Sequence, residues 1–208
     1  MDTPSVDVHG RLAARLRGLR ADRGLSLDAL AERAGVSRSM ISLVERGESS
    51  PTAAVLDRLA AGLGVTIAAL FAEPARPDAS PLARRGEQSS WRDPGSGYVR
   101  RNLSPPGYPS PIELVEVRLP PGARVAYDTP GSARAVGLHQ QLWILEGRVE
   151  LTVGDAAHQL EGGDCLAMRV DRPIVFHNRH DRDARYLVAV TADAVPARAG
   201  ADHGGSAP

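Results

Sequence analysis

Apolar residues in the first third of the chain recur every three or four positions, and polar residues fill the positions between them. Leu12, Leu16 and Leu19 form the first such stripe, which ends at Gly24. This spacing places side chains on one face of a helix. Further stripes predict four more short helices, in the regions 26–34, 37–46, 52–63 and 67–71. Five helices with short loops should pack as one bundle over residues 11–72.

The sequence also predicts where the second and third helices begin and end. Ser26 and Ser37 each stand just before an apolar stripe, where a serine hydroxyl can accept a backbone N–H of the first helical turn. Gly35 can adopt the left-handed conformation that ends a helix. The region from Ser26 to Pro51 therefore indicates two short helices joined by a tight turn.

The outer side of the second of these helices carries small polar side chains and one arginine. Its outward residues are Ser37, Arg38, Ser39 and Ser42. Side chains of this kind can reach base edges in the DNA major groove while the capped backbone is held at the phosphates. The pattern therefore favours a DNA-recognition helix.

The hydrophobic pattern changes after Trp91, from helical spacing to an alternation of apolar and polar residues. Alternation predicts β-strands, and Gly, Pro and Asp separate them at regular intervals. We expect strands at residues 113–119, 141–146, 148–153, 157–160, 165–168, 174–178 and 185–191. Short, evenly spaced strands indicate an all-β barrel or sandwich over residues 91–192. The chain is thus predicted to be a two-domain α + β protein.

Three segments are expected to lie outside these two domains. Residues 73–90 are rich in Pro, Ser, Ala and charged residues and are predicted to form a linker. Residues 1–10 should form a flexible arm, and the Gly- and Ala-rich residues 193–208 should form a disordered tail.

The formal net charge is zero, so no global positive field attracts nucleic acid. Positive charge is local instead, because Arg11, Arg15, Arg17, Arg20 and Arg23 crowd the first helix. Either they form a solvated helix face, or some of them contact phosphates. The start of the chain lacks the apolar core of a signal peptide, and no apolar run is long enough to span a membrane. We therefore expect a cytoplasmic protein without a membrane contact.

A longer motif surrounds the two central helices: AERAGVSRSMISLVERGESSPT. It resembles the helix-turn-helix of the Cro/CI-type, or XRE, family of bacterial regulators, over about Arg11 to Phe71. The resemblance implies contacts with operator DNA from Ser26, Ser37, Arg38, Ser39, Met40, Ser42, Arg46, Arg17 and Arg20. For Arg46 two roles stay open, a phosphate contact or an internal ion pair in which Glu45 and Arg46 join the first helix. Because one short helix reads few base pairs, a homodimer on two half-sites is expected.

The second half resembles the cupin family of small jelly-roll barrels, through the runs LWILEGRVELTVGD, LEGGDCLAM, DRPIVFHN and RYLVAVT. Asn178 matches the closing Asn of that family. Many cupins hold iron or manganese with two His, a Glu and a third His. Those four positions correspond here to Arg134, Val136, Gln140 and Ile174, which offer neither imidazole nor carboxylate. The resemblance therefore implies a barrel without metal or other cofactor.

Some histidines and one cysteine remain as alternative ligands. A displaced metal site is conceivable at His139, His158, His177 and His180, with scattered surface histidines as the simpler interpretation. If Gln140 faces inward, strand alternation turns His139 outward. Cys165 is the one cysteine, so an intramolecular disulfide is excluded, and we expect it to be a small buried hydrophobe.

A barrel without metal still offers a concave interior, and alternation points Gln140, Leu142, Ile144, Ile174 and Phe176 toward it. We predict an effector site formed by Arg134 near the mouth and by Gln140, Leu142, Ile174 and Phe176. Mostly apolar walls with a few polar groups suit a small molecule. An amide and an arginine favour a small organic acid. The alternative is a filled barrel that serves only for dimerisation.

The leading hypothesis is a sequence-specific, nucleoid-associated transcriptional regulator that responds to an effector and is not an enzyme. A first alternative is a cupin metalloenzyme, such as an oxygenase or epoxidase, with a helix-turn-helix-like head. Stoichiometric iron linked to substrate turnover would identify it. A second alternative is a nucleoid or antitoxin-type DNA binder without an effector, which would bind all DNA sequences alike.

Overall fold

Five helices come first in the computed structural model, which describes residues 8–128 and 137–192. They are α1 (Val8–Asp22), α2 (Leu27–Ala34), α3 (Arg38–Glu45), α4 (Ala53–Leu63) and α5 (Ile67–Phe71). The predicted five-helix bundle, which we call the head, is therefore confirmed. α1 begins at Val8, inside the stretch predicted as an arm. The rest of the arm, the predicted tail and Arg134 lie outside the described residues.

Side-chain caps start the helices where the sequence predicts them. Ser26 Oγ accepts the backbone N–H of Ala29 (3.0 Å), and Ser37 Oγ accepts that of Met40 (3.3 Å). Gly35 follows α2 with φ 61°, a left-handed conformation that strains any residue with a Cβ. Local chemistry therefore fixes the turn between α2 and α3.

The core of the head is built from the predicted apolar stripes. Its buried side chains come from all five helices: Leu12, Leu16, Leu19, Leu30, Ile41, Val44, Leu56, Leu59, Leu63 and Leu70. Burying one such side chain contributes about 2 kcal/mol, so the core holds α3 firmly by its inner side. None of the described helices is long and apolar enough to cross a membrane.

The second part of the chain forms two antiparallel sheets, which we call the β-domain (residues 90–192). One sheet has the order β1-β2-β3-β10-β5-β8 and consists of β1 (Ser90–Arg92), β2 (Val99–Asn102), β3 (Glu113–Leu119), β10 (Ala184–Ala192), β5 (Leu138–Glu146) and β8 (Cys165–Arg169). The other has the order β4-β9-β6-β7 and consists of β4 (Arg124–Tyr127), β9 (Ile174–His177), β6 (Arg148–Val153) and β7 (Ala156–Glu161).

The strand predictions hold in part. All seven expected strands are present within a few residues of their predicted bounds, whereas β1, β2 and β4 were not predicted. β2 has the sequence VRRN, which shows no apolar alternation, and its pairing with β3 makes it a strand. Within the described residues no strand pairing joins the two sheets, so the closed jelly-roll barrel is not confirmed.

Two residues hold tight connections in the β-domain. Gly147 joins β5 to β6 with φ 76°, and a Cβ there would lie 2.7 Å from the carbonyl oxygen of Asp183. Asn178 is fully buried, and its Nδ2 donates to the carbonyl oxygens of Leu119 (2.9 Å) and Arg182 (2.7 Å). The residue that matches the closing Asn of cupins therefore ties the turn after β9 to the end of β3.

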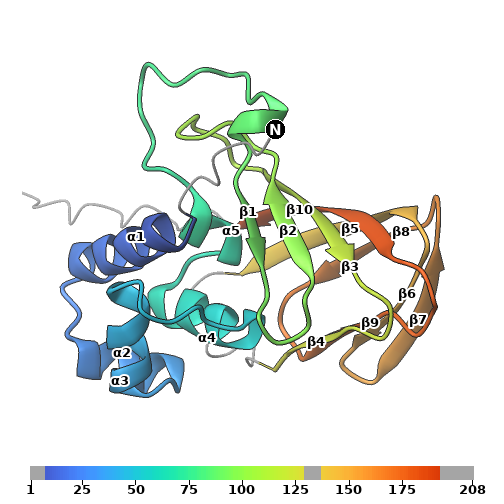
Figure 1. Cartoon of the computed structure of the whole chain (residues 1–208), viewed down its shortest axis with the longest axis horizontal. Helices are drawn as coiled ribbons and strands as arrows, with labels where there is room; N and C mark the ends of the chain where they lie inside the picture. The colour runs from blue at the N-terminus through green and yellow to red at the C-terminus, as the bar shows by residue number, and fades with distance from the viewer. Residues whose placement is uncertain (1–7, 129–136, 193–208) are drawn as a thin grey trace, which may run out of the picture.

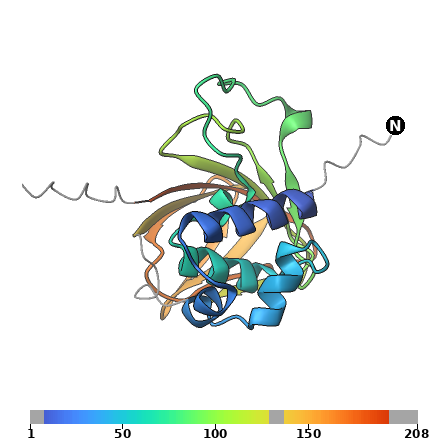
Figure 2. The same cartoon turned by 90° about the vertical axis from the view of Figure 1, so that its left-hand side faces the viewer.

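The head packs directly against one end of the β-domain, with α4 and α5 next to the strands (Figures 1 and 2). Asp93, buried just after β1, accepts the backbone N–H of Ala53 in the first turn of α4 (2.9 Å). Its carboxylate also faces the positive end of the helix dipole. At the start of α5, the Thr66 hydroxyl donates to the Glu113 carboxylate on β3. These contacts fix the place of the head on the sheets.

The segment predicted as a linker loops away from the head before it enters β1, and it makes contacts of its own (Figure 1). It contains a 3-10 turn, η1 (Arg85–Glu87), and the N–H of Arg76 donates to the carbonyl oxygen of Gly107 (2.9 Å). Where it enters β1, the ring of Trp91 packs on Phe71 of α5, with 5.8 Å between the ring centroids. The head is thus joined to the β-domain by direct packing as well as by this segment.

Candidate nucleic-acid interface

The N-terminal half of α3 lies on the surface of the head, because its buried residues Ile41 and Val44 are on the other side. Ser37, Arg38 and Ser39 are exposed, and we call these three residues the α3 surface. Two further predicted residues differ from them: Met40 packs partly against the core, and Ser42 is half-buried. Ser26 caps α2 in the way that Ser37 caps α3, and it therefore belongs to the start of the other helix. The structure therefore brings three of the predicted residues together.

Arg38 has a partner that sequence reasoning missed. Its Nε lies 3.2 Å from Oδ1 of Asp28 in the first turn of α2, and the two side chains are 63% and 76% exposed. An ion pair this exposed is weak. Arg38 can therefore exchange Asp28 for a base edge or a phosphate oxygen.

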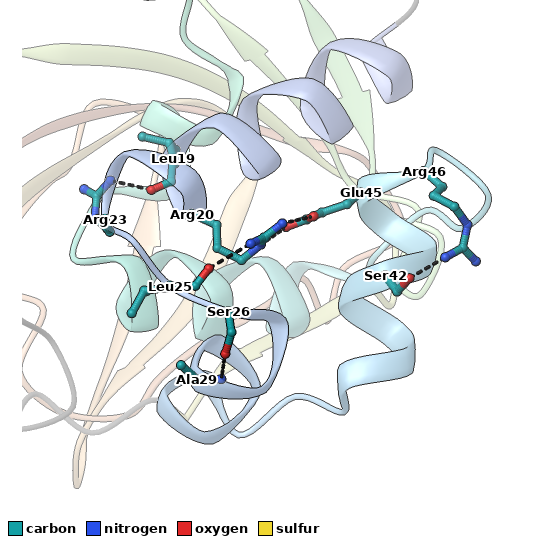
Figure 3. Close-up of polar contacts among 9 residues, drawn as sticks. All are labelled: Leu19, Arg20, Arg23, Leu25, Ser26, Ala29, Ser42, Glu45 and Arg46. Atoms are coloured by element: carbon teal, nitrogen blue, oxygen red, sulfur yellow. Dashed lines mark hydrogen bonds and ion pairs between the residues drawn. The ribbon is translucent and has the colours of Figure 1, made fainter.

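Arg46 directly follows α3 and is exposed. Its Nη1 donates to the Ser42 hydroxyl (Figure 3). Its Nε donates to Oε1 of Glu48 (2.6 Å). The bond to Glu48 raises the pKa of Arg46 and lowers that of Glu48. Of the two roles left open for Arg46, an ion pair is present, but it is made with Glu48 and not with α1.

Arg20 is tied to the end of α3 (Figure 3). Its Nε and Nη2 donate to the two carboxylate oxygens of Glu45 (2.7 and 2.8 Å), and its Nη1 donates to the carbonyl oxygen of Leu25 (2.8 Å). The hydrogen bond to Glu45 raises the pKa of Arg20. Because the guanidinium is fully engaged inside the head, the geometry favours a structural role for Arg20 over the predicted DNA contact.

The other arginines of α1, and Arg23 directly after it, divide between internal contacts and solvent. Arg15 Nε donates to the carbonyl oxygen of Ala69 in α5 (3.2 Å). Arg23 Nη1 donates to the carbonyl oxygen of Leu19 (3.0 Å) (Figure 3). Arg17 is exposed. Arg17 is therefore better placed than its neighbours for the phosphate contact that the sequence predicts.

A second candidate site lies inside the β-domain. Strands from both sheets enclose a cavity of about 90 Å³, and α4 and α5 close one side of it. Gln140, Ile174 and Phe176 line this cavity as predicted, whereas Leu142 is fully buried and is not among the lining residues. His139 is exposed, as strand alternation predicts.

The most polar residues of the cavity were not identified from the sequence. They are Arg100 of β2 and Asp57 of α4, together with Tyr98, Tyr127 and Tyr186. Burial raises the pKa of all three tyrosines, so their hydroxyls stay neutral and can donate hydrogen bonds. The sequence signal that could have found them is the pair Tyr98 and Arg100, two residues apart and hence on one side of a strand.

Known proteins resemble this chain over its head and beyond. Residues 11–73 match a family model described as a helix-turn-helix domain. The HTH-type transcriptional regulator SutR of Escherichia coli strain K12 is 27% identical over 175 residues, which cover 84% of this chain and 91% of the relative. The HTH-type transcriptional regulator PuuR of the same strain is 26% identical over 178 residues, which cover 85% and 92%.

A solved structure extends the likeness to the whole fold. The crystal structure of an HTH_3 family transcriptional regulator from Vibrio cholerae is 28% identical and has a TM-score of 0.68, covering 90% of this chain and 98% of that one. The chain is a DNA-binding transcriptional regulator with a helix-turn-helix head. In this regulator the helix-turn-helix head comes first and the two antiparallel sheets of the β-domain follow.

The regulator's possible metal ligands are dispersed. Among residues 8–128 and 137–192, no three His, Cys, Asp or Glu side chains are grouped as a metal site requires. His177 Nδ1 lies 4.0 Å from Oε1 of Glu150.

Cys165 is exposed, so the prediction of a buried cysteine is wrong. Its strand, β8, is the edge strand of its sheet and pairs Cys165 with the exposed Trp143.

Proposed function

We propose that the regulator binds operator DNA as a homodimer and that its β-domain binds a small-molecule effector without metal. The α3 surface carries the DNA part of this proposal. Ser37, Arg38 and Ser39 project from the first turn of a helix whose other side is anchored in the core. A forked guanidinium in this position can read a guanine in the major groove. Arg17 and Arg46 are the proposed phosphate contacts, and Arg20 is left out because Glu45 holds it.

The cavity supports the effector part of the proposal. Its walls are mostly apolar, and a few polar groups, among them Gln140 and Arg100, are aimed into it. This combination is typical of small-molecule sites. Gln140 stands where metal-binding cupins carry a carboxylate, and an amide there suits an organic ligand better than a metal ion. We therefore propose a jelly-roll interior used for sensing and not for catalysis.

The outer face of the larger sheet is the proposed contact between the two copies. Ile112, Leu114 and Trp143 are exposed by 51%, 40% and 48%. Leu114 and Trp143 flank the same strand, β10, opposite Ala189 and Leu187, and strand alternation places them on one face. Apolar side chains grouped in water favour association, and two half-sites require two heads.

Selection of bound duplexes from a randomised DNA library tests the proposed function. The full chain should enrich an inverted repeat whose half-sites lie about one helical turn apart. A library that stays random after repeated rounds, with measurable binding throughout, would show that the chain does not read sequence.

A further inference from the structure

The cavity in the β-domain is completed by the DNA-binding head. Asp57 of α4 and Thr66, Ile67 and Ala68 at the start of α5 all line it, opposite residues of both sheets. The bond from Ala53 to Asp93 and the bond from Thr66 to Glu113 hold this wall in place. A ligand in the cavity would therefore touch the head and the β-domain at once.

Arg100 is a buried cation at this cavity. It is 7% exposed, and its Cζ lies 5.3 Å from the centre of the Phe71 ring on α5. Its neighbour Arg101 carries an ion pair with Glu116 (2.9 Å), but no ion pair among the described residues involves Arg100. Its buried Nε also has no hydrogen-bond partner within the described part of the chain.

A buried cation without an ion-pair partner is unfavourable, because burial removes its hydration and no direct ion pair replaces it. The carboxyl group of Glu113, which interacts with Arg100, compensates only in part. Glu113 accepts the Thr66 hydroxyl, and burial raises the pKa of its carboxyl, which weakens it as a counter-charge. Asp57 lines the cavity from the head. An anionic ligand could supply the missing partner through a forked hydrogen bond to Arg100.

The walls indicate the shape and size of such a ligand. The rings of Phe176 and Tyr186 are stacked at 5.8 Å, Tyr127 meets Phe176 edge-on at 6.0 Å, and the hydroxyls of Tyr98 and Tyr127 lie 3.2 Å apart. One water needs roughly 10–15 Å³ of cavity volume. The cavity of about 90 Å³ therefore has room for about six to nine water-sized groups. Flat walls of this size suit a small aromatic or branched acid.

We propose that the cavity binds a small carboxylate through Arg100, and that the head forms part of the binding site. This proposal rests on the effector site of the proposed function and names its ligand class and its link to the head. A ligand that contacts both the head and the β-domain favours the arrangement in which α4 and α5 are packed against the strands around the cavity. Occupancy of the cavity thereby changes the position of α3 relative to DNA.

Benzoate, with benzamide as the uncharged control, tests the ligand class on the full chain. Benzoate should raise the melting temperature and benzamide should not. Arg100→Met should weaken benzoate binding at least tenfold in calorimetry, whereas Arg124→Met, at an exposed arginine of β4, should leave it unchanged. If Arg100→Met does not fold, Arg100→Lys replaces it, with the same loss expected because lysine lacks the fork. Equal shifts with benzoate and benzamide, or none with either, would overturn the proposal.

Asp57 tests whether the head is part of the site. Asp57→Asn removes a negative charge from the head side of the cavity, so benzoate should bind severalfold more tightly. Glu32→Gln, an exposed change on α2, should have no effect. Benzoate affinity unchanged by Asp57→Asn would contradict a role for the head.

The link to DNA has a separate readout, the affinity of the full chain for its selected duplex. Benzoate should change this affinity at least threefold in the wild type and not in Arg100→Met. An unchanged affinity, with benzoate bound, would refute the link. Failure to select any DNA sequence would reject the proposed function, and the calorimetry would still decide the carboxylate site.

Discussion

Arg20 of α1 and Glu45 of α3 form a two-pronged ion pair, with Nε–Oε1 and Nη2–Oε2 distances of 2.7 and 2.8 Å. The two side chains are 18% and 7% exposed. Glu45 is the last residue of α3, so this pair sets how far the end of that helix lies from α1. The orientation of the α3 surface thus depends on an ion pair inside the head, between two residues that do not themselves need to contact DNA.

Replacing Arg20 should therefore lower stability more than replacing an exposed arginine. Arg20→Met leaves the buried Glu45 carboxylate without its partner, and the free energy of unfolding should fall by about 2–3 kcal/mol. Urea unfolding measures this loss. The matched control is Arg46→Met, which removes the exposed ion pair with Glu48 and should change the unfolding midpoint little. Equal effects of the two substitutions would mean that the Arg20–Glu45 pair has no special structural role.

Arg38 should read a base. Arg38→Ala should cost about 1–3 kcal/mol on the selected duplex and relax the sequence preference at one position of each half-site. Arg172→Ala, at an exposed arginine of the β-domain, serves as the control for loss of charge. If Arg38→Ala weakens binding to selected and random DNA alike, Arg38 contacts phosphate and not a base.

Asp28 should restrain Arg38 in the absence of DNA. Asp28→Asn removes the partner that lies 3.2 Å from Arg38 Nε and removes a negative charge beside the α3 surface. Affinity for DNA should rise, and more at low salt, because exposed charges are then less screened. A titration of labelled duplex at two salt concentrations measures the change. Lower affinity in the variant would show that Asp28 positions Arg38 for binding.

Trp143 should belong to the contact between two copies. Trp143→Arg places a charge in the exposed apolar face of the larger sheet. Sedimentation should then show a monomer, whereas we expect the wild type to sediment as the proposed dimer. The exposed Leu82, in the segment before β1, offers a control outside this face, and Leu82→Arg should leave the dimer intact. A Trp143→Arg protein that remains dimeric would assign dimerisation to another surface.

Glu113 should make stability depend on pH. Burial raises its pKa above the ordinary value of 4.5, so the folded state holds the proton more tightly than the unfolded state. Stability is then lost as the pH rises from about 4.5 through the folded pKa, and it stays lower above that value. Glu113→Gln keeps an acceptor for Thr66 without the charge. The variant should be more stable than the wild type at neutral pH, and this gain should vanish in acid.

Urea midpoints at acid and neutral pH measure the difference. The control is Glu116→Gln on the same strand, which should show no gain at neutral pH because its carboxylate pairs with Arg101 at 2.9 Å. A Glu113→Gln protein with no gain at neutral pH would mean that the Glu113 carboxylate is stabilised by its neighbours after all.

The head could be predicted well because its signals are local. Caps such as Ser26 and Ser37 act within one turn of their helices, and Gly35 ends α2 by its own backbone conformation. The long strands could be predicted for a similar reason, since alternation over five or more residues is visible in the sequence. The inward direction of Gln140 was expected from that alternation together with the cupin resemblance, and Gln140 lines the cavity.

The sequence by itself determined the five helices, the exposed residues of α3 and the long strands, because each depends on residues within a few positions of one another. Only the tertiary structure decided the partners of charged side chains and the extent of the cavity. Arg20 meets Glu45 across 25 positions, and Arg100 joins Asp57 at one cavity although they lie on different domains. No local sequence pattern predicts these contacts between distant residues. They arise only when helices and sheets pack and bring distant charges into the same buried space.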